Sequence, residues 1–226
     1  NGILKIKVIK ESNNSYTSGR IITKNKFDFK YGRVDIRAKL PTIAGTWPAL
    51  WMLGANINSV SWPSCGEIDI MEAKGRLPYE ASGAIHYGGQ WPNNTYSFGT
   101  YTFPLGQSIN EFHTYAIEWE ENVIRWYIND NLFYQTSDWY SENGAYPAPF
   151  DTSFYIILNL AVGGNWPGNP DESTTFPKEM LVDYIRVYKD MNPDTIDGLE
   201  IIDPEKPSTG NLIVNGQFNL WQADYL

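Results

Sequence analysis

Several features that define common protein classes are missing from this 226-residue sequence. Its single cysteine, Cys65, excludes a disulfide within the chain and leaves no cysteine framework for zinc or redox chemistry. No apolar run approaches the ~20 residues of a membrane-spanning helix. Acidic residues outnumber basic ones, 26 to 17, and the resulting net charge of −9 argues against nucleic acid or an anionic membrane as the partner. We therefore expect a neutral ligand.

The sequence also lacks a sustained helical period. Its apolar residues alternate in short runs between Gly, Pro and Asn, which predicts an all-β sandwich or barrel. Residues 46–53 are apolar at nearly every position and fit either a buried strand or a short helix. After a strand at 81–87 we expect a long loop that contains Trp91 and Tyr96. The other predicted strands are residues 3–9, 19–23, 27–29, 33–40, 112–118, 123–133, 154–162 and 180–188.

The stretch GEIDIMEA at residues 66–73 carries three carboxylates among apolar residues. Glu67 and Asp69 alternate with isoleucines, which predicts a strand with both acidic side chains on one face. Glu72 follows Glu67 by five positions, so on a regular strand it would point the other way. One extra residue in a β-bulge would return it to the acidic face. We expect Met71 to be that residue, because its flexible side chain suits an irregular position.

Carboxylates gathered on one sheet face suit hydrolysis of a glycosidic bond, in which one attacks the sugar and another, with a raised pKa, protonates the leaving oxygen. Two alternatives are an acidic strand that merely faces solvent and a calcium site. The tryptophan-rich flanks favour the sugar interpretation over the cation site. Aromatic residues make up 15% of the chain, including 9 Trp and 15 Tyr, and can stack on sugar rings.

Five segments resemble glycoside hydrolase family 16 and occur in that family's order. They are WPALWML at 47–53, WPSCGEIDIMEAKG at 62–75, FHTYAIEWEEN at 112–122, LNLAVGGNWPG at 158–168 and VDYIRVY at 182–188. Within the family the sequence is similar to the bacterial laminarinases, which are secreted endo-β-1,3-glucanases. The resemblance implies a β-jelly-roll sandwich of two antiparallel sheets with a concave substrate groove and a Met-containing bulge in the acidic motif.

The resemblance also implies residue roles. Glu67 would be the nucleophile and Glu72 the general acid/base, while Asp69 would hold the nucleophile's orientation and charge. No cofactor is expected for catalysis. For two of the tryptophans expected at the sugar groove, Trp51 and Trp119, a place in the core is the alternative. The residues expected to line or adjoin the sugar groove are Arg20, Trp47, Trp51, Trp62, His86, Trp119, Asn159 and Trp166.

A structural Ca²⁺ is a further implication of the resemblance. Its ligands would include Asp183 on the last strand and the backbone carbonyl at Gly2. An unpaired carboxylate on an otherwise apolar strand would be costly, so a cation partner for Asp183 is physically reasonable. A salt bridge to Arg or Lys is the alternative.

By composition we expect a catalytic domain at residues 1–190, a Pro-containing linker at 191–210 and, at 211–226, the truncated start of a carbohydrate-binding module. Family members carry a further N-terminal segment, including a strand that pairs with the last strand. We expect this segment to be missing from this chain or supplied by another chain, and the protein otherwise to be a monomer.

The leading functional hypothesis is retaining endo-hydrolysis of β-1,3-glucan or mixed β-1,3/1,4-glucan, with the polysaccharide as the partner. A competing hypothesis is a non-catalytic β-glucan-binding protein on the same fold, but such proteins lack the two catalytic glutamates. A third is a galactan, agar or carrageenan hydrolase of the same family. Sulfated substrates would favour a basic groove, whereas this chain is acidic overall.

Overall fold

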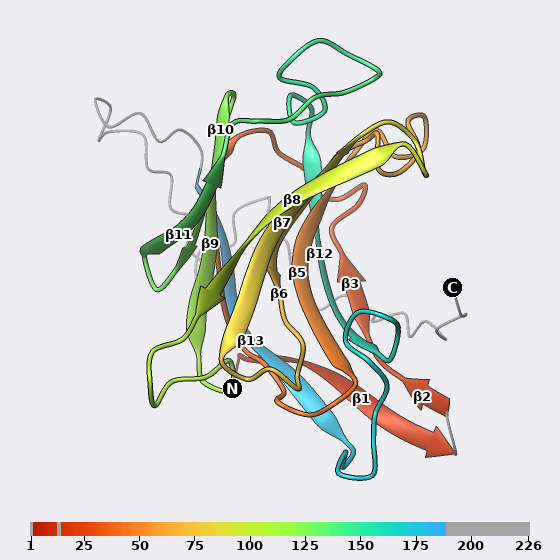
Figure 1. Ribbon diagram of the computed structural model, residues 1–226, viewed down its shortest axis with the longest axis vertical. Helices are drawn as coiled ribbons and strands as arrows, with labels where there is room; N and C mark the ends of the chain where they lie inside the picture. The colour runs from red at the N-terminus through yellow and green to blue at the C-terminus, as the bar shows by residue number, and fades with distance from the viewer. Residues whose placement is uncertain (1, 13–14, 189–226) are drawn as a thin grey trace.

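The computed structural model describes residues 2–12 and 15–188, which form two antiparallel β-sheets (Figure 1). The seven-stranded sheet has the order β11-β10-β9-β4-β13-β1-β2, and the six-stranded sheet has the order β3-β12-β5-β6-β7-β8. The prediction of an all-β sandwich is therefore confirmed. Among the described residues, no helix is long and apolar enough to cross a membrane.

Short strands joined by turns and loops follow one another along the described part of the chain. They are β1 (Leu4–Ser12), β2 (Ser15–Thr17), β3 (Arg20–Ile22), β4 (Gly32–Lys39), β5 (Thr46–Gly54), β6 (Glu67–Glu72), β7 (Glu80–Gly88), β8 (Asn94–Thr102), β9 (His113–Glu120), β10 (Val123–Ile128), β11 (Asn131–Thr136), β12 (Phe154–Val162) and β13 (Lys178–Tyr188).

Alternation along the strands places one set of side chains between the two sheets. In β4, Val34 and Ile36 are fully buried, while Arg33 and Asp35, on either side of Val34, face outward. The six-stranded sheet contributes the apolar residues of β5, β6 and β12 to the same core. Burying each large aliphatic side chain contributes about 1.5–3 kcal/mol. The inner face of β6 therefore anchors the strand that carries the acidic motif.

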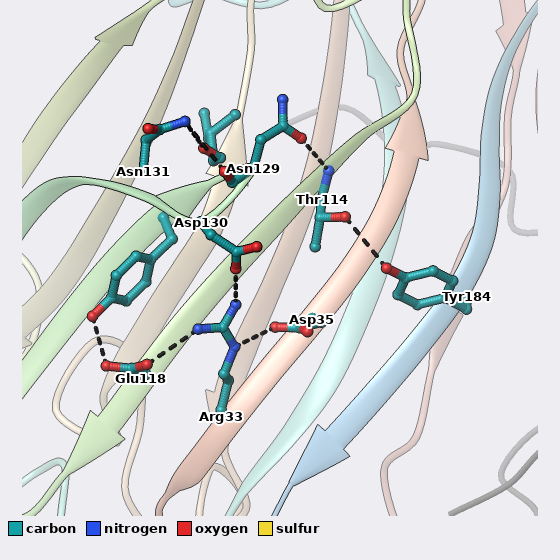
Figure 2. A network of polar contacts seen from close by, with 10 residues as sticks. Arg33, Asp35, Thr114, Glu118, Asn129, Asp130, Asn131 and Tyr184 are labelled. Carbon is teal, nitrogen blue, oxygen red and sulfur yellow. Dashed lines mark hydrogen bonds and ion pairs between the residues drawn. The ribbon is translucent and has the colours of Figure 1, made fainter. Parts of the chain in front are cut away.

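A polar network covers the outer face of the seven-stranded sheet (Figure 2). Arg33 donates hydrogen bonds to Asp35 at 2.7 Å, to Glu118 at 3.1 Å and to Asp130 at 2.6 Å. Burial alone would lower the pKa of Arg33, but the hydrogen bonds and charges of these carboxylates outweigh it and raise the pKa. One guanidinium thus joins β4, β9 and the turn between β10 and β11.

Three predictions about secondary structure are wrong. The strand expected at 27–29 is only an isolated bridge, in which Phe29 pairs with Phe154. The single strand expected at 123–133 is a hairpin, because Asn129 and Asp130 adopt left-handed φ values of 50° and 61° and form its two-residue turn. The long loop expected after residue 87 is mostly strand β8, whose alternating Tyr, Phe and Thr residues pair with β7. Of the two alternatives for residues 46–53, the strand is observed as β5.

The last strand, β13, pairs with β4 along one side and with β1 over residues 178–182 along the other. The expected linker at 191–210 and the expected start of a binding module at 211–226 lie outside the described residues. That an N-terminal segment is missing or supplied by another chain, and that the protein is otherwise a monomer, stay predictions.

Candidate active site

Strand β6 contains the bulge that the sequence predicted. On the β7 side, Asp69 pairs with Ala84 and Glu72 with Ser82, so two residues of β6 lie opposite Gly83 alone. The extra residue restores Glu72 to the face that carries Asp69 and, two positions earlier, Glu67. We call this outer face of the six-stranded sheet the carboxylate face.

The extra residue itself was predicted incorrectly. On the β5 side, Leu50 pairs with Met71 and Trp51 pairs with Asp69, which leaves Ile70 without a partner. Met71 keeps its place in the ladder with β5, and its side chain fills the core, where it is 1% exposed. The side chain of Ile70 is also buried, at 2% exposure. Both bulge residues thus turn toward the core, and the carboxylates on either side of them turn outward.

The opposite sheet holds the bulge in place. The Trp126 indole N–H, on β10, crosses the core and donates a 2.8 Å hydrogen bond to the backbone carbonyl of Asp69. Opposite the bulge, a Cβ on Gly83 would lie 2.1 Å from the Trp126 ring, so a side chain there would displace the tryptophan. A carbonyl buried without a partner costs about 1–3 kcal/mol, and Trp126 removes that cost.

Two indole N–H groups bind the ends of the acidic row. Trp62 donates to Glu67 Oε2 at 2.8 Å, and Trp47 donates to Glu72 Oε1 at 2.8 Å. His86, on β7, places Nε2 3.3 Å from Asp69 Oδ2 and 3.7 Å from Glu67 Oε1. The carboxyls are therefore oriented by aromatic side chains before any ligand arrives.

All three carboxyls have raised pKa values. Burial, followed by the charge of Asp69, raises the pKa of Glu67 to about 8. Burial and then the charge of Glu72 raise the pKa of Asp69, and burial raises that of Glu72 although the Trp47 hydrogen bond opposes the shift. Since ionising one carboxyl makes it harder to ionise the next, the row retains protons near neutral pH. It can therefore offer a proton donor and a carboxylate together.

Most of the predicted groove residues also lie on the carboxylate face. Trp51 pairs with Asp69, and its indole N–H donates to Asn159 Oδ1 at 2.7 Å. The Arg20 guanidinium lies 4.8 Å from the centre of the Trp51 ring. Burial lowers the pKa of Arg20, while the charges of Tyr155 and Glu67 act in the opposite direction. This arrangement supports a position for Arg20 beside the site.

Trp166 lies at the other end of the face. Its ring centre is 5.1 Å from that of Trp47, and the Lys74 ammonium lies 4.3 Å from the ring. Because Trp47 also binds Glu72, these aromatic side chains continue the site beyond the acidic row. Trp47 and Trp166, which were both expected beside the groove, are therefore in contact with each other next to the acidic row.

Trp119 is the exception, and its predicted place on the groove is wrong. It belongs to β9 in the opposite sheet and is fully buried in the core. Its ring packs edge-on against Phe154 at 5.1 Å, and its N–H donates to the carbonyl of Phe150 at 3.1 Å. Trp119 occupies a position of β9 whose side chain points between the two sheets, so it cannot touch a ligand on the carboxylate face.

Sequence reasoning missed Trp126 and Lys74. Trp126 alternates with other apolar residues on β10 and looks like an ordinary core residue, so no local signal links it to the acidic motif. Lys74 lies two positions after Glu72, and this proximity could have indicated its place near Trp166. Both contacts join segments that only the fold brings together.

Two places could hold a cation. Ligand atoms of Glu67, Asp69 and His86 lie within 4.8 Å of one another, which leaves the cation interpretation of the acidic row chemically open. The second place is the calcium site expected at Asp183, where Arg37 Nη1 binds Asp183 Oδ2 at 2.5 Å. At Asp183 the structure therefore contains the salt bridge that was the alternative to a metal.

A β-sandwich that orients buried carboxyls with tryptophan N–H groups on an outer sheet face has the groups that a carbohydrate-active protein needs. The family model for glycosyl hydrolases family 16 matches residues 2–186. The chain belongs to that family, and the expected family resemblance is confirmed.

Individual relatives agree with this assignment. The chain is 52% identical over 183 residues to a glucan endo-1,3-beta-glucosidase A1 from Niallia circulans and 40% identical over 187 residues to a beta-glucanase from Rhodothermus marinus. Each alignment covers 77% of this chain, but only 26% and 63% of the two relatives. The chain therefore spans about a quarter and about three-fifths of their lengths.

A solved structure shares the fold. The laminarinase catalytic domain from Thermotoga maritima superposes with a TM-score of 0.73 at 43% sequence identity. The match covers 85% of this chain and 79% of that domain. The jelly-roll architecture implied by the sequence is thus confirmed.

Proposed function

We propose that this chain is a retaining endo-glucanase that hydrolyses β-1,3-glucan of the laminarin type, with mixed β-1,3/1,4-glucan as a second substrate. The observation that carries the proposal is the bulge, which gathers Glu67, Asp69 and Glu72 on one face with a tryptophan N–H on each terminal glutamate. The Niallia and Rhodothermus relatives, named as a glucan endo-1,3-beta-glucosidase and a beta-glucanase, support this choice of substrate.

In this mechanism Glu67 attacks the anomeric carbon while Glu72 gives its proton to the leaving oxygen, so the glycosidic bond breaks as a glycosyl ester forms. Glu72 then takes a proton from water, whose oxygen displaces Glu67 and restores the carboxylate. The Trp62 N–H and His86 stabilise the anionic form of Glu67. Because burial raises the pKa of Glu67 to about 8, the attack begins from the molecules in which Glu67 is ionised.

The remaining carboxylate-face residues would bind the sugar chain. Trp51 and Trp166 offer partly exposed indole rings, and Asn159 and Arg20 offer polar groups beside them. Stacking of sugar C–H faces on such rings is an effective use of aromatic area. We propose that these four residues, with Trp47, Trp62 and His86, form the substrate-binding surface.

The test is to replace each terminal glutamate. Glu67→Gln and Glu72→Gln keep the shape of the side chain but lose the charge or the proton, so each should retain less than about a hundredth of the wild-type rate on laminarin. Binding of laminarin should persist in both. Glu111→Gln, at an exposed position away from β6, is the matched control and should keep full activity. A variant that retained more than about a tenth of the rate would refute its assigned role.

The same assay separates the competing functions. Sizing the products from laminarin, lichenan and agarose distinguishes a β-1,3-glucanase from a mixed-linkage enzyme and from a galactan hydrolase. NMR of the fresh product should show the anomer of the substrate, as a covalent intermediate requires. Retention of laminarin without any products would instead favour a glucan-binding protein.

We also propose a structural Ca²⁺ near Asp183 and the backbone of Gly2, as the family resemblance implies. The antiparallel pairing of Leu4 with Val182 supports it, because the chain just before Leu4 runs beside Asp183. A cation there would have to displace Arg37 from the carboxylate. Adding EDTA should lower the melting temperature of the wild type but not that of Asp183→Asn, and an unchanged wild-type melting temperature would argue against the site.

Secretion and a monomeric state complete the proposal. Endo-hydrolysis of a polysaccharide takes place where the polymer is, and this supports a location outside the cell. Sedimentation measures the number of chains, and assay of the culture medium against the cell fraction tests secretion.

A further inference from the structure

Strand β8 forms one edge of the six-stranded sheet (Figure 1). It carries two large exposed aromatic side chains, Tyr96 and Phe98. Tyr96 pairs with His86 and Phe98 pairs with Ala84 on β7. Directly paired residues of antiparallel strands share a face. Since His86 contacts Asp69, Tyr96 and Phe98 lie on the same face as the acidic row.

The odd-numbered residues of β8, from Ser97 to Tyr101, point the other way. A Cβ at Gly99 would lie 2.4 Å from the Tyr134 ring, and Tyr101 packs edge-on against Phe133 at 5.7 Å. The phase of β8 is therefore fixed by packing against the opposite sheet, and the outward position of Tyr96 and Phe98 follows from it.

Both side chains remain open to solvent although the core packing of β8 is complete. Tyr96 is 59% exposed and Phe98 is 57% exposed. Single exposed aromatics are common on protein surfaces, but adjoining ones more often mark a binding site. These two rings are neighbours, with centres 6.0 Å apart and planes inclined by 28°.

The pair continues a row of rings that begins at the acidic motif. The ring centres of Trp62 and His86 are 6.1 Å apart, and those of His86 and Tyr96 are 5.6 Å apart. The row thus runs from the indole that binds Glu67, across β7, to Phe98 on the sheet edge. Strand β8 lies two strand spacings from β6, about 10 Å, a length on the order of two sugar units.

From this continuity we propose that Tyr96 and Phe98 form a remote subsite that stacks with pyranose rings of the glucan chain beyond the bond being cleaved. The inference rests on the proposed function and deepens it, because it predicts a preference for long chains. A short oligosaccharide that fills only the positions next to Glu67 and Glu72 does not reach β8. A polymer does, and the exposed rings then bury apolar area against its C–H faces.

The test combines Tyr96→Thr and Phe98→Thr, which remove the rings but keep residues that favour strands. On laminarin the double variant should show a KM raised about tenfold with kcat within about twofold of wild type. On laminaritriose both constants should stay within about twofold. The matched control is Tyr79→Thr, which removes an equally exposed ring, at 57%, outside the row. Melting temperatures of all variants establish that they are folded.

A second measurement separates this subsite from the proposed function. Hydrolysis of laminarin by the wild type tests the proposed function. The subsite is tested by binding instead, by comparing how strongly immobilised laminarin retains Glu67→Gln and the triple variant that combines Glu67→Gln with Tyr96→Thr and Phe98→Thr. Weaker retention of the triple variant supports the subsite. Equal retention, or no retention of either protein, overturns it. The subsite is also overturned if the wild type is a dimer, the double threonine variant is a monomer, and their KM values are equal. In that case the two rings would bind a second copy of the chain at the edge formed by β8.

Discussion

Glu67 shows how its surroundings set the chemistry of a single residue. Its carboxyl lies beside Asp69, receives the Trp62 N–H and approaches His86, yet burial dominates and raises its pKa to about 8. The folded protein therefore binds a proton at Glu67 between about pH 4.5 and 8, where the unfolded chain has lost it.

This difference predicts how stability changes with pH. Because the folded pKa is raised, the contribution of Glu67 to stability is fully present below about pH 4.5 and is lost as the pH rises through about 8. Glu67→Gln has no proton to lose. It should therefore be more stable than wild type at about pH 9, on the order of a few kcal/mol, since each pKa unit corresponds to about 1.4 kcal/mol.

Thermal unfolding at several pH values measures the effect. The advantage of Glu67→Gln should shrink steadily toward about pH 4.5. Glu111→Gln serves again as the control, because Glu111 is exposed, and its difference from wild type should not vary in this way. An advantage of Glu67→Gln that grew on acidification would contradict the raised pKa.

At the scale of the strand, the bulge in β6 depends on a residue from the other sheet. Trp126 satisfies the backbone carbonyl of Asp69 and fills the space that Gly83 leaves open. The outward turn of Glu72 depends on that bulge. Trp126 is thus a positioning residue, which acts on the carboxylates through the backbone of β6.

We predict that Trp126→Phe lowers activity more than its loss of stability explains. The carbonyl of Asp69 would stay buried without a donor, at a cost of about 1–3 kcal/mol, and the bulge could relieve that cost by shifting. We expect kcat on laminarin to fall about tenfold or more in protein that remains folded, with a smaller change in KM.

Trp139→Phe is the matched control. The Trp139 indole also donates to a backbone carbonyl, that of Pro147, at 2.9 Å, but in a loop away from β6. The two variants should lose similar stability by urea unfolding, and only Trp126→Phe should lose kcat. Equal kcat in the two proteins would show that the hydrogen bond from Trp126 does not position the site.

At the scale of the whole molecule, the two sheets have different tasks. The six-stranded sheet presents the carboxylate face, whereas the outer face of the seven-stranded sheet carries the Arg33 network (Figure 2). The side chains of Arg33 and Glu118 are each 17% exposed, so this network is only partly screened by water. Its role is to join strands of the supporting sheet.

Arg33→Gln should therefore affect stability and leave catalysis unchanged. It leaves the partly buried carboxylates of Asp35 and Glu118 without their cation, so we expect a loss of about 2–4 kcal/mol. Arg125→Gln breaks the more exposed pair with Glu120 and should cost less than about 1 kcal/mol. Urea unfolding measures both values. If kcat/KM fell with Arg33→Gln, the two faces would be coupled.

Local patterns in the sequence determined the fold class, the acidic strand and the need for a bulge. Alternation has a period of two residues, so it records which side chains share a face without reference to the rest of the chain. The out-of-phase position of Glu72 required one extra residue, and β6 contains it. The predicted positions of Trp47, Trp62 and His86 around the row also agree with the structure.

Only the tertiary structure decided the contacts between distant segments. Trp119 and Trp51 both lie on apolar strands, and nothing local distinguishes a ring directed into the core from one on the carboxylate face. Likewise, the donor from Trp126 to β6 and the place of Tyr96 beside His86 depend on sheet packing and strand order. The physical reason is that alternation fixes a side chain's face relative to its own strand, whereas packing between sheets decides which face is buried.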